Sequence, residues 1–391
     1  MSAPRLSIVV VGAGIAGLAA AAALARAGHA VEVVERAPAL REVGAGLQLS
    51  PNAMKAVDAL GAGEAVRAAG FAPEAVELRL FRSGRTVWRN PLTTAEARFG
   101  APYLQIHRAQ LLSALAEAAR GAGARITLGE TVQRAEADGL LATDRAERRA
   151  DLVLGADGVR SALRAQVAGA SRPRFSGHAA FRGTVDAARL PEGLVRPAAN
   201  VWMGPRAHFV SYLIRRGGTV NFVAVTERRD WKAEGWSAPG DLPALRARFA
   251  GWHPAVRRIL DAADEAFEWG LFEHAPLPRW SNGRVALIGD AAHPTLPFMA
   301  QGAAMALEDA VTLARALETA PSEAALRGWE AVRKPRCNSL QAAARRNGWR
   351  FHCRSAPERW VKAGALALFG ALAPARAQAL TDWVYAYDPV A

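Results

Sequence analysis

The chain has 391 residues, of which 51% are hydrophobic and 22% charged, a composition typical of a folded globular protein that excludes disorder over most of its length. Its formal net charge of +13 comes almost wholly from arginines scattered along the chain, without a basic stripe interleaved with aromatic residues, so a nucleic-acid partner is not expected. Two cysteines, Cys337 and Cys353, exclude a disulfide framework and indicate a reducing compartment, so we expect a cytoplasmic protein.

The first forty residues predict a strand, a helix and a second parallel strand. These elements are expected at Leu6–Val11, Ile15–Ala27 and Ala30–Val34. Gly28 is placed to end the helix, and Glu35 ends the second strand. The eighteen uncharged residues Ile8–Ala25 resemble a short membrane span, but the glycines within them favour the strand, turn and helix, so stable membrane insertion is not expected.

A glycine-rich motif joins the first strand to the helix. Gly12 allows the tight turn, Gly14 lets the backbone approach a pyrophosphate, and Gly17 lets the helix pack against the strand. Glu35, eighteen residues beyond the last glycine, is placed to accept hydrogen bonds from a ribose. The motif therefore predicts dinucleotide binding without separating NAD from FAD.

Residues 175–186 and 200–226 are rich in β-branched and aromatic side chains, and Arg216-Gly217-Gly218 breaks the second stretch as a hairpin turn does. They predict an antiparallel sheet inserted between two segments of the parallel sheet. Within it, His208 and Tyr212 are four residues apart, so both are expected on one face of a strand, where they line a single pocket.

Two later apolar runs, Asp151–Leu154 and Arg284–Ile288, predict further strands of the parallel sheet. Each leads into an acidic turn, Asp157-Gly158 and Gly289-Asp290. Ligands of open α/β sheets bind at this edge. The residues that follow Asp290 contain two prolines before a helix begins near Gly302, which is typical of a loop that covers a ligand.

These motifs together resemble the three fingerprints of the single-component FAD-dependent aromatic hydroxylases, the para-hydroxybenzoate hydroxylase superfamily. The residues concerned are Gly12–Gly17 with Glu35, Asp157-Gly158, and Gly289-Asp290-Ala291-Ala292-His293-Pro294. Further segments resemble the branch of 3-hydroxybenzoate 6-hydroxylase, salicylate hydroxylase and 6-hydroxynicotinate 3-monooxygenase. They are Gly44-Ala45-Gly46-Leu47-Gln48, Ile106-His107-Arg108, Ala300-Gln301-Gly302 and Asp382-Trp383-Val384-Tyr385.

The resemblance implies an FAD site in which Asp290 holds the ribityl chain, Arg108 contacts the cofactor near its pyrophosphate, and Asp157 with Gly158 serves both FAD and the pyridine nucleotide. The full set of implied cofactor-binding residues is Gly12, Gly14, Ala16, Gly17, Glu35, Arg36, Gly46, Gln48, Arg108, Val132, Asp157, Gly158, Asp290, Pro297, Gly302 and Ala303. No metal ligands are expected.

The implied chemistry is hydroxylation of a small aromatic substrate, a phenolic acid or an N-heteroaromatic analogue, with NADH or NADPH and O₂, through a C4a-hydroperoxyflavin. His208 takes the phenol proton, with Tyr212 and Gln301 as the other catalytic candidates. Gln301 and Gln48 are candidates to orient the substrate, although a structural amide explains either equally well. Arg182 is a candidate partner for a substrate carboxylate, with a surface ion pair as the alternative.

The expected fold is α/β: a Rossmann-like FAD-binding domain (1–72, 101–172 and 280–345), a mainly antiparallel substrate domain (73–100 and 173–279) and a C-terminal helical tail (346–391). A homodimer is left open. Two alternatives remain at this point. One is a flavin-dependent hydroxylase or reductase of a lipid-like quinone precursor, and the other is a non-catalytic dinucleotide-binding regulator.

Overall fold

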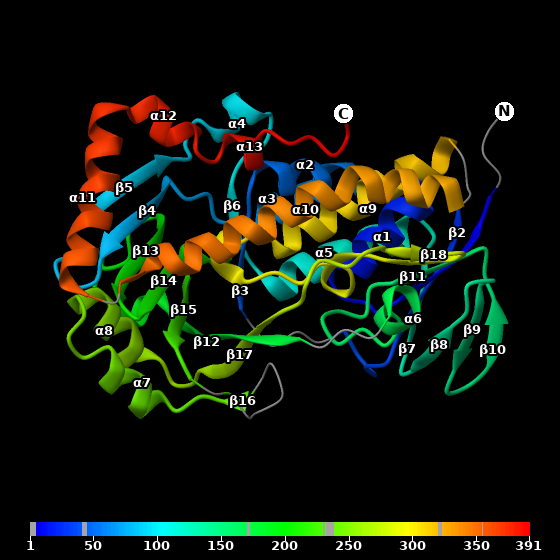
Figure 1. Ribbon diagram of the computed structural model, residues 1–391, viewed down its shortest axis with the longest axis horizontal. Coiled ribbons are helices and arrows are strands. Elements are labelled where there is room, and N and C mark those ends of the chain that lie inside the picture. The colour runs from blue at the N-terminus through cyan, green and yellow to red at the C-terminus, as the bar shows by residue number, and fades with distance from the viewer. Residues whose placement is uncertain are drawn as a thin grey trace.

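The computed structural model describes residues 5–40, 45–169, 173–229, 231, 238–319, 323–353 and 355–391. None of the helices in these ranges is long and apolar enough to cross a membrane. Figure 1 shows an elongated molecule with a parallel sheet toward one end and a larger, mainly antiparallel sheet toward the other.

The parallel sheet has the strand order β18-β19-β11-β1-β2-β7, in which all neighbours except β18 and β19 run parallel. Its strands are β1 (Ser7–Val11), β2 (Ala30–Glu35), β7 (Arg125–Leu128), β11 (Leu152–Gly155), β18 (Ser281–Asn282) and β19 (Val285–Leu287). The predicted strands and the helix α1 (Ile15–Arg26) are confirmed to within two residues. Gly28 follows the helix with φ of 91°, a left-handed conformation that favours glycine.

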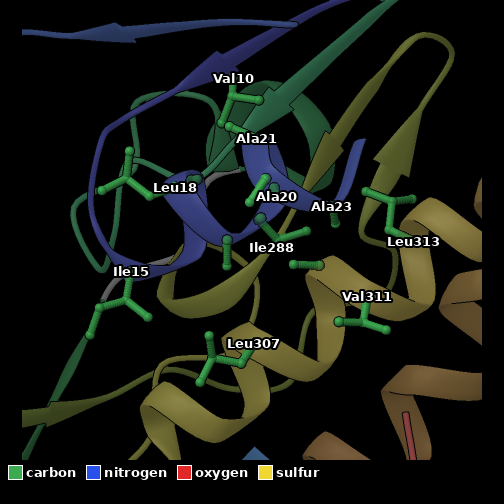
Figure 2. Close-up of a cluster of buried hydrophobic side chains, with 14 of the residues drawn as sticks. Val10, Ile15, Leu18, Ala20, Ala21, Ala23, Ile288, Leu307, Val311 and Leu313 are labelled. Carbon is green, nitrogen blue, oxygen red and sulfur yellow. The ribbon is translucent and has the colours of Figure 1, made fainter. Parts of the chain in front are cut away.

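Helix α1 packs between the sheet and the helices α5 (Arg108–Gly121) and α9 (Gly302–Thr319). Figure 2 shows Ala20 and Ala23 of α1 close to the Leu307 and Val311 side of α9. Because alanine side chains are short, two helices can approach each other closely here. The alanine-rich sequence therefore brings the start of α9, and the loop before it, against the glycine motif.

Smaller elements complete this end of the molecule. They are β3 (Gly46–Leu49), which pairs with β6 (Leu104–His107), the three-stranded sheet β8 (Val132–Ala135), β9 (Leu140–Thr143) and β10 (Glu147–Arg149), and the helices α2 (Pro51–Ala59), α3 (Gly63–Ala69), α4 (Ala95–Phe99) and α6 (Arg164–Ala168).

The larger sheet has the order β16-β17-β12-β15-β14-β13-β4-β5, with β20 also paired to β13. Its strands are β4 (Ala75–Leu80), β5 (Thr86–Pro91), β12 (Arg174–Asp186), β13 (Ala198–Pro205), β14 (Ala207–Ile214), β15 (Thr219–Glu227), β16 (Ala238–Pro239), β17 (Phe267–Glu273) and β20 (His352–Cys353). The antiparallel sheet predicted from residues 175–186 and 200–226 is confirmed, and the predicted turn is the 3-10 segment η2 (Arg215–Gly217).

The prediction missed a second turn within 200–226. The chain reverses at Arg206, whose φ is 52°, and this turn separates β13 from β14. The signal was the dipeptide Gly204-Pro205, which favours a turn even between apolar runs.

The two faces of this sheet contact different neighbours. One face buries side chains such as Phe209 and Phe222 against helices α7 (Leu242–Arg248) and α8 (Pro254–Ala262). The other packs Val210, Val225 and Trp269 with Phe298, which lies in the segment η4 (Pro297–Met299) just before α9. The loop expected to cover a ligand therefore lies on this second face.

Helix α10 (Glu323–Phe351) runs along the molecule from β18 to β20 and so joins the two sheets (Figure 1). It continues past residue 345, where the C-terminal tail was expected to begin. The short 3-10 segments η1 (Ala187–Arg189) and η3 (Gly289–Ala291) and the helices α11 (Ala356–Leu372), α12 (Pro374–Ala379) and α13 (Asp382–Tyr385) complete the fold.

Candidate active site

The glycine motif closes tightly on the neighbouring strand end. A Cβ at Gly17 would lie 1.8 Å from the carbonyl oxygen of Gly12, and one at Gly12 would lie 2.7 Å from that of Ala156. Gly14 differs, because a Cβ there meets nothing within 4 Å. The two outer glycines are thus required for packing within the protein, whereas Gly14 faces open space, as the backbone that approaches a pyrophosphate must.

Glu35 ends β2 beside this turn and holds it. Its carboxylate accepts hydrogen bonds from the backbone N–H of Ala13 at 2.7 Å and from that of Ala37 at 2.8 Å. A carboxylate has about four acceptor positions, so two remain for a ribose. Arg36 next to it is exposed, and Val132 begins β8 just after β7, which pairs with β2 at Glu35.

The second fingerprint follows β11. Asp157 accepts from the Ala162 N–H through Oδ2 at 2.8 Å, while its Oδ1 is buried without a hydrogen bond. Arg164, only 4% exposed, donates to the carbonyl of Asp290 at 3.0 Å and leaves Nε and Nη1 without partners. Buried polar groups without partners are rare in proteins, so these atoms indicate a missing polar ligand.

Asp290 follows β19 at the same edge of the sheet. Its side chain is exposed, yet the protein packed around it raises its pKa above the ordinary value, against the opposing effects of His293, Arg108 and Arg164. The Asp290 carboxyl group is thus accessible to solvent at the edge of the sheet. It is placed to accept hydrogen bonds from a hydroxylated chain, since several positive groups favour its charged form.

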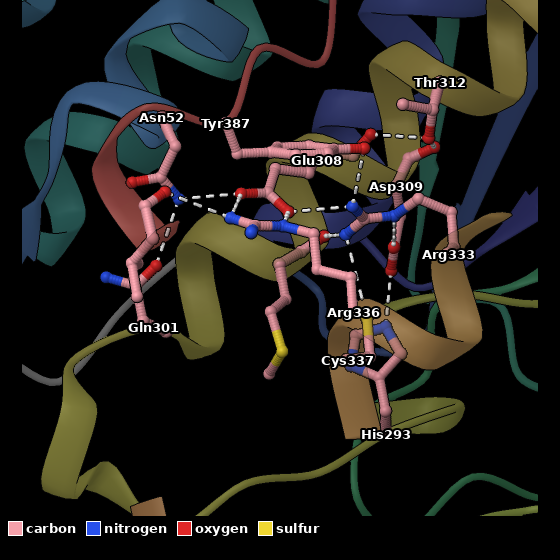
Figure 3. A network of polar contacts seen from close by, with 12 residues as sticks. Asn52, His293, Gln301, Glu308, Asp309, Thr312, Arg333, Arg336, Cys337 and Tyr387 are labelled. Atoms are coloured by element: carbon pink, nitrogen blue, oxygen red, sulfur yellow. Dashed lines mark hydrogen bonds and ion pairs between the residues drawn. The ribbon is translucent and has the colours of Figure 1, made fainter. Parts of the chain in front are cut away.

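A buried ionic network holds the loop after Asp290 (Figure 3). Asp309 of α9 accepts from the Gly289 N–H at 3.0 Å, contacts His293 Nε2 at 2.6 Å, and accepts from Arg333 Nε of α10 at 2.9 Å. These partners outweigh the effect of burial and lower the pKa of Asp309 to about 2. The pKa of His293 is raised well above its usual value because Cys337 and Asp309 outweigh burial, so the pair is charged at neutral pH.

Gln301 belongs to the same network. Its Oε1 accepts from Asn52 Nδ2 at 3.0 Å and its Nε2 donates to Ser50 Oγ at 2.9 Å, and the side chain is 3% exposed. Asn52 in turn donates to Glu308 at 2.7 Å. Both ends of the Gln301 amide are therefore engaged within the protein, which favours the structural alternative over direct contact with a substrate.

Strand β3 lies between the two sheets. The Gly46 N–H donates to Asn221 Oδ1 of β15 at 2.6 Å, and a Cβ at Gly46 would lie 2.6 Å from the Tyr212 ring. Gln48 accepts from the Tyr103 hydroxyl at 2.7 Å, and the Arg108 N–H donates to the carbonyl of Ala45 at 2.8 Å. Gly46, an expected cofactor residue, thus lies directly against Tyr212, an expected substrate residue.

His208 and Tyr212 share one face of β14, as their spacing predicts. His208 packs edge-on to Phe298, with ring centroids 5.2 Å apart, and both His208 and Tyr212 are buried. In register, Val210 of β14 pairs with Val223 of β15, which pairs with Arg182 of β12. Since paired residues point to the same side of a sheet, Arg182 lies on this face too, two strands from β14.

Electrostatics set the protonation of these groups. Burial and the neighbouring His352 and His178 lower the pKa of His208 well below its usual value, so its imidazole is neutral at pH 7. Burial raises the pKa of Tyr212 above its ordinary value, against the opposing effects of Arg182 and Asn221, so its hydroxyl remains a donor. The Arg182 guanidinium lies over the Trp269 ring, 5.0 Å from its centroid.

The geometry at the sheet edge fits FAD. The carboxyl ends of β1, β2, β11 and β19 meet there, with the open backbone at Gly14, the unpartnered Asp157 Oδ1 and the exposed Asp290. Helix α9 begins at Gly302, so the half-buried Gly302 and Ala303 present free backbone N–H groups. Ala16 packs beside Gly289, and Pro297 is exposed on the loop.

Sequence reasoning missed Arg164, Asp309 and Arg333. The signal for Asp309 was the acidic pair Glu308-Asp309 between the apolar runs Ala303–Leu307 and Ala310-Val311, because charged residues are buried only with partners. It also found no metal-ligand spacing, whereas the fold gathers two His- and acid-containing groups, His178, Glu227 and His352, and His293, Asp309 and Cys337. The second is accounted for by the ionic network.

Comparisons with known proteins agree with this geometry. A family model described as an FAD binding domain matches residues 5–343. The chain is 39% identical over 367 residues to 3-amino-4-hydroxybenzoate 2-monooxygenase of Streptomyces platensis, covering 93% of this chain and 92% of the relative. It is 36% identical over 394 residues to 3-hydroxybenzoate 6-hydroxylase of Polaromonas naphthalenivorans, covering 98% and 96%.

A solved salicylate hydroxylase in complex with its substrate has a TM-score of 0.81 and 27% sequence identity to this chain, and the match covers 98% of this chain and 96% of that one. The mixed α/β fold is therefore that of FAD-dependent hydroxylases, and the resemblance predicted from the motifs is confirmed. These relatives support neither a quinone-precursor enzyme nor a regulator. The chain belongs to the FAD-binding family of FAD-dependent aromatic monooxygenases.

Proposed function

We propose that the enzyme hydroxylates a small aromatic acid that carries a ring hydroxyl, or its N-heteroaromatic analogue, and consumes NADH or NADPH and O₂. Bound FAD supplies the redox chemistry, taking hydride from the nicotinamide and activating O₂. The observation that carries the proposal is the gathering of His208, Tyr212 and Arg182 on one sheet face beside Gly46 and Phe298. A base, a neutral donor and a cation are what a phenolic carboxylate requires.

His208 is the base in this proposal. Its neutral imidazole takes the proton of the ring hydroxyl, which leaves a phenolate far more electron-rich than the phenol. Tyr212, which stays protonated, donates a hydrogen bond to the substrate oxygen. The two side chains lie on one face of β14, on either side of Val210, so they can approach one substrate from two directions.

Arg182 is the proposed partner of the substrate carboxylate. A guanidinium binds a planar carboxylate through two parallel hydrogen bonds, and its stacking on Trp269 orients it. Arg182 is half-buried on the same face of the sheet as His208, which disfavours the alternative of a surface ion pair.

The loop 294–301 has the role of excluding water. Leu296 and Phe298 are buried on the substrate face, and Asn347 of α10 donates to the carbonyl of Phe298 at 3.1 Å. Gln301, held by Ser50 and Asn52, fixes the end of this loop at the start of α9. We therefore place Gln301 as a positioning residue.

On the cofactor side, we propose that the glycine motif, Glu35 with Arg36, Val132 and Asp157 with Gly158 hold the adenosine and pyrophosphate part of FAD. The remaining residues, Ala16, Gly46, Gln48, Arg108, Asp290, Pro297, Gly302 and Ala303, surround the ribityl chain and the ring. The N-terminus of α9, at Gly302, would stabilise negative charge on a flavin ring bound beside it. The support is the meeting of these residues at one edge of the sheet.

We also propose a homodimer in the cytoplasm, where the free buried Cys337 and Cys353 remain reduced. Apolar side chains are exposed over α11 and its surroundings, which suits burial against a second copy. These side chains are Trp349, Trp360, Val361, Leu368 and Leu372. Light scattering of the purified protein tests this, with a monomer as the contradicting result.

The test of the function is a substrate panel. The FAD-loaded enzyme is assayed with 3-amino-4-hydroxybenzoate, 3-hydroxybenzoate, salicylate and 6-hydroxynicotinate, with NADH or NADPH. At least one compound is expected to accelerate NAD(P)H consumption and to yield a hydroxylated product. Consumption that no aromatic acid accelerates contradicts the proposal.

A further inference from the structure

Behind His208, on the side of β14 nearest β20, lies a chain of polar groups from three different elements. His208 Nδ1 is 2.8 Å from His352 Nε2, a hydrogen-bond distance between residues 144 positions apart in sequence. His352 Nδ1 in turn lies 3.4 Å from Glu227 Oε1, the last residue of β15. His208 and His352 are 2% and 3% exposed, and the Glu227 side chain 14%, so the chain leads outward from the buried base.

The position of Glu227 selects how the two imidazoles share their protons. A carboxylate beside His352 Nδ1 favours a proton on that nitrogen, which leaves His352 Nε2 as an acceptor. His208 Nδ1 must then donate to it, and His208 Nε2 keeps a free electron pair. With the opposite tautomers, His208 Nε2 carries a proton and has no electron pair for a substrate proton.

Resting on the proposed function, we propose that His352 and Glu227 form a proton relay that carries the substrate's hydroxyl proton away from His208. The hydroxyl O–H bond breaks as an N–H bond forms at His208 Nε2. The proton on His208 Nδ1 moves to His352 Nε2, and the imidazolium on His352 faces the Glu227 carboxylate. The proton on His352 Nδ1 then leaves through Glu227 to water, which leaves both rings in the opposite tautomers. When the product oxygen takes back the proton on His208 Nε2, the same transfers run in reverse from water and restore the starting tautomers without any redox change.

The surroundings explain why a relay is needed. Phe298 and Phe351 pack edge-on to His208 at 5.2 and 5.3 Å, so a cation held there lacks solvation. Burial and His178 lower the pKa of His352 to about 4, so both rings begin neutral. Glu227 is the acidic group of the chain, and its contact with His352 Nδ1 lies at ion-pair distance without good hydrogen-bond alignment, so it strengthens when His352 becomes charged.

The other charged groups near this chain argue against a metal ion at the same place. His178, Glu227 and His352 are close enough together to hold one. However, Arg206 Nε already donates to Glu227 at 3.0 Å, and Lys362 Nζ donates to the carbonyl of His352 at 3.2 Å. Two positively charged side chains beside these three residues disfavour binding of a metal cation, whereas they favour release of a proton toward solvent.

The experiment compares the FAD-loaded wild type with His352→Gln and Glu227→Gln, using a substrate that the wild type hydroxylates. Ionisation of the bound hydroxyl is followed by its ultraviolet absorbance between pH 5 and 9, together with kcat and KM. We expect about a tenfold to hundredfold lower kcat at pH 7 for His352→Gln, little change in KM, and substrate ionisation displaced to higher pH. Glu227→Gln is expected to give a smaller change in the same direction.

A substrate analogue with an electron-withdrawing ring substituent, already ionised at the assay pH, is expected to restore the rate of both variants toward that of wild type. Glu268→Gln is the matched control. Glu268 lies on β17 with a 15% exposed side chain and is paired with an arginine, as Glu227 is, but it lies in register with Phe209, on the opposite face of the sheet from His208. Its ionisation curve is expected to match that of the wild type.

Each failure has its own signature. A wild type that hydroxylates nothing overturns the proposed function. An active wild type whose two variants bind FAD and keep an unchanged ionisation curve overturns the relay, as does a loss of rate that the ionised analogue fails to restore. Stoichiometric metal in the wild type that is absent from His352→Gln also overturns it.

Discussion

At the scale of single residues, the glycine motif divides into positions that the protein's own packing requires and a position, Gly14, that faces open space. A Cβ at Gly17 would meet the Gly12 carbonyl at 1.8 Å, and neither backbone segment can move away without displacing α1 from β1. Gly14 has no such neighbour, and its φ of −75° suits any residue. Similar glycines in one motif therefore have different physical roles.

We predict that Gly17→Ala lowers the free energy of unfolding by about 3 kcal/mol or more, because overpacking against backbone cannot relax. Gly14→Ala is expected to leave stability within about 1 kcal/mol while weakening FAD binding, since its methyl group faces the pyrophosphate. Urea unfolding of the apoproteins and flavin fluorescence titration measure the two effects. A Gly14→Ala variant that binds FAD like wild type contradicts this division.

Arg182→Gln tests substrate recognition at the same scale. Loss of a charged hydrogen-bonded partner weakens binding by about 1.5–3 kcal/mol, so KM is expected to rise about tenfold to a hundredfold for a carboxylated substrate. The corresponding phenol without a carboxylate is expected to show little change. Arg174→Gln on the same strand, whose side chain is 80% exposed, is the control. An equal rise in KM for both compounds would refute a carboxylate partner.

Some residues of the candidate site could be predicted from the sequence, and others could not. The glycines and acidic turns follow from fixed local spacing, because strand, turn and helix dictate which residue types fit. The neighbours of His208 do not follow from local spacing. His352 lies just after the long helix α10, and the pairing of β20 with β13 brings it near His208. Likewise, the amide of Gln301 is explained by Ser50 and Asn52, some 250 positions earlier.

At the scale of elements, α9 and α10 are locked together by charges rather than by apolar contacts alone. Arg333 is fully buried and donates to Glu308 at 2.8 Å and to Asp309 at 2.9 Å, and Arg336 donates to Glu308 at 2.7 Å (Figure 3). This pairing also holds Gly289 and His293, so helix packing positions the loop that covers the site.

Arg333→Met is expected to lower the free energy of unfolding by about 3–5 kcal/mol, because it leaves buried carboxylates without a partner. Arg327→Met on the same helix removes only an exposed pair with Glu323 and is expected to change stability by about 0.5 kcal/mol or less. Thermal and chemical unfolding of the two variants measure the difference. Equal effects would show that the network contributes no more than a surface pair.

The pKa of Asp309 predicts a pH dependence. Its folded-state pKa, about 2, lies below its ordinary value of 3.8, so its contribution is present above about pH 4 and is lost as pH falls toward 2. That contribution is about 2 kcal/mol. The stability difference between wild type and Asp309→Asn is therefore expected to shrink by this amount from pH 5 to pH 2. A constant difference across this range would contradict the assignment.

The elements of the parallel sheet could be predicted from sequence because strands buried on both faces are continuous apolar runs. The turn at Arg206 was harder to predict, because the strands on either side of it are both apolar and the dipeptide Gly204-Pro205 is a short local signal. The full length of α10 could not be predicted either, because Pro335 lies inside it and proline commonly ends a helix.

At the scale of the whole molecule, the two sheets meet where β3 contacts β14 and where α10 spans from one sheet to the other. The edge of the parallel sheet where we propose that FAD binds and the face of the antiparallel sheet that carries His208 thus both lie beside β3. Many arginines responsible for the net charge of +13 are paired with acidic groups on the surface, as Arg189 is with Asp264 and Arg134 with Glu147. The remaining positive charge suits small anions such as dinucleotides and aromatic acids.

The central claim is that this arrangement couples the oxidation of NAD(P)H to hydroxylation of an aromatic acid through His208. The most direct measurement is the amount of hydroxylated product formed per NAD(P)H consumed, for the FAD-loaded wild type and for His208→Ala. We predict a ratio near one for the wild type with its substrate. In His208→Ala, NAD(P)H oxidation is expected to continue while product falls about a hundredfold or more. Equal product per NAD(P)H in the two proteins would contradict the account.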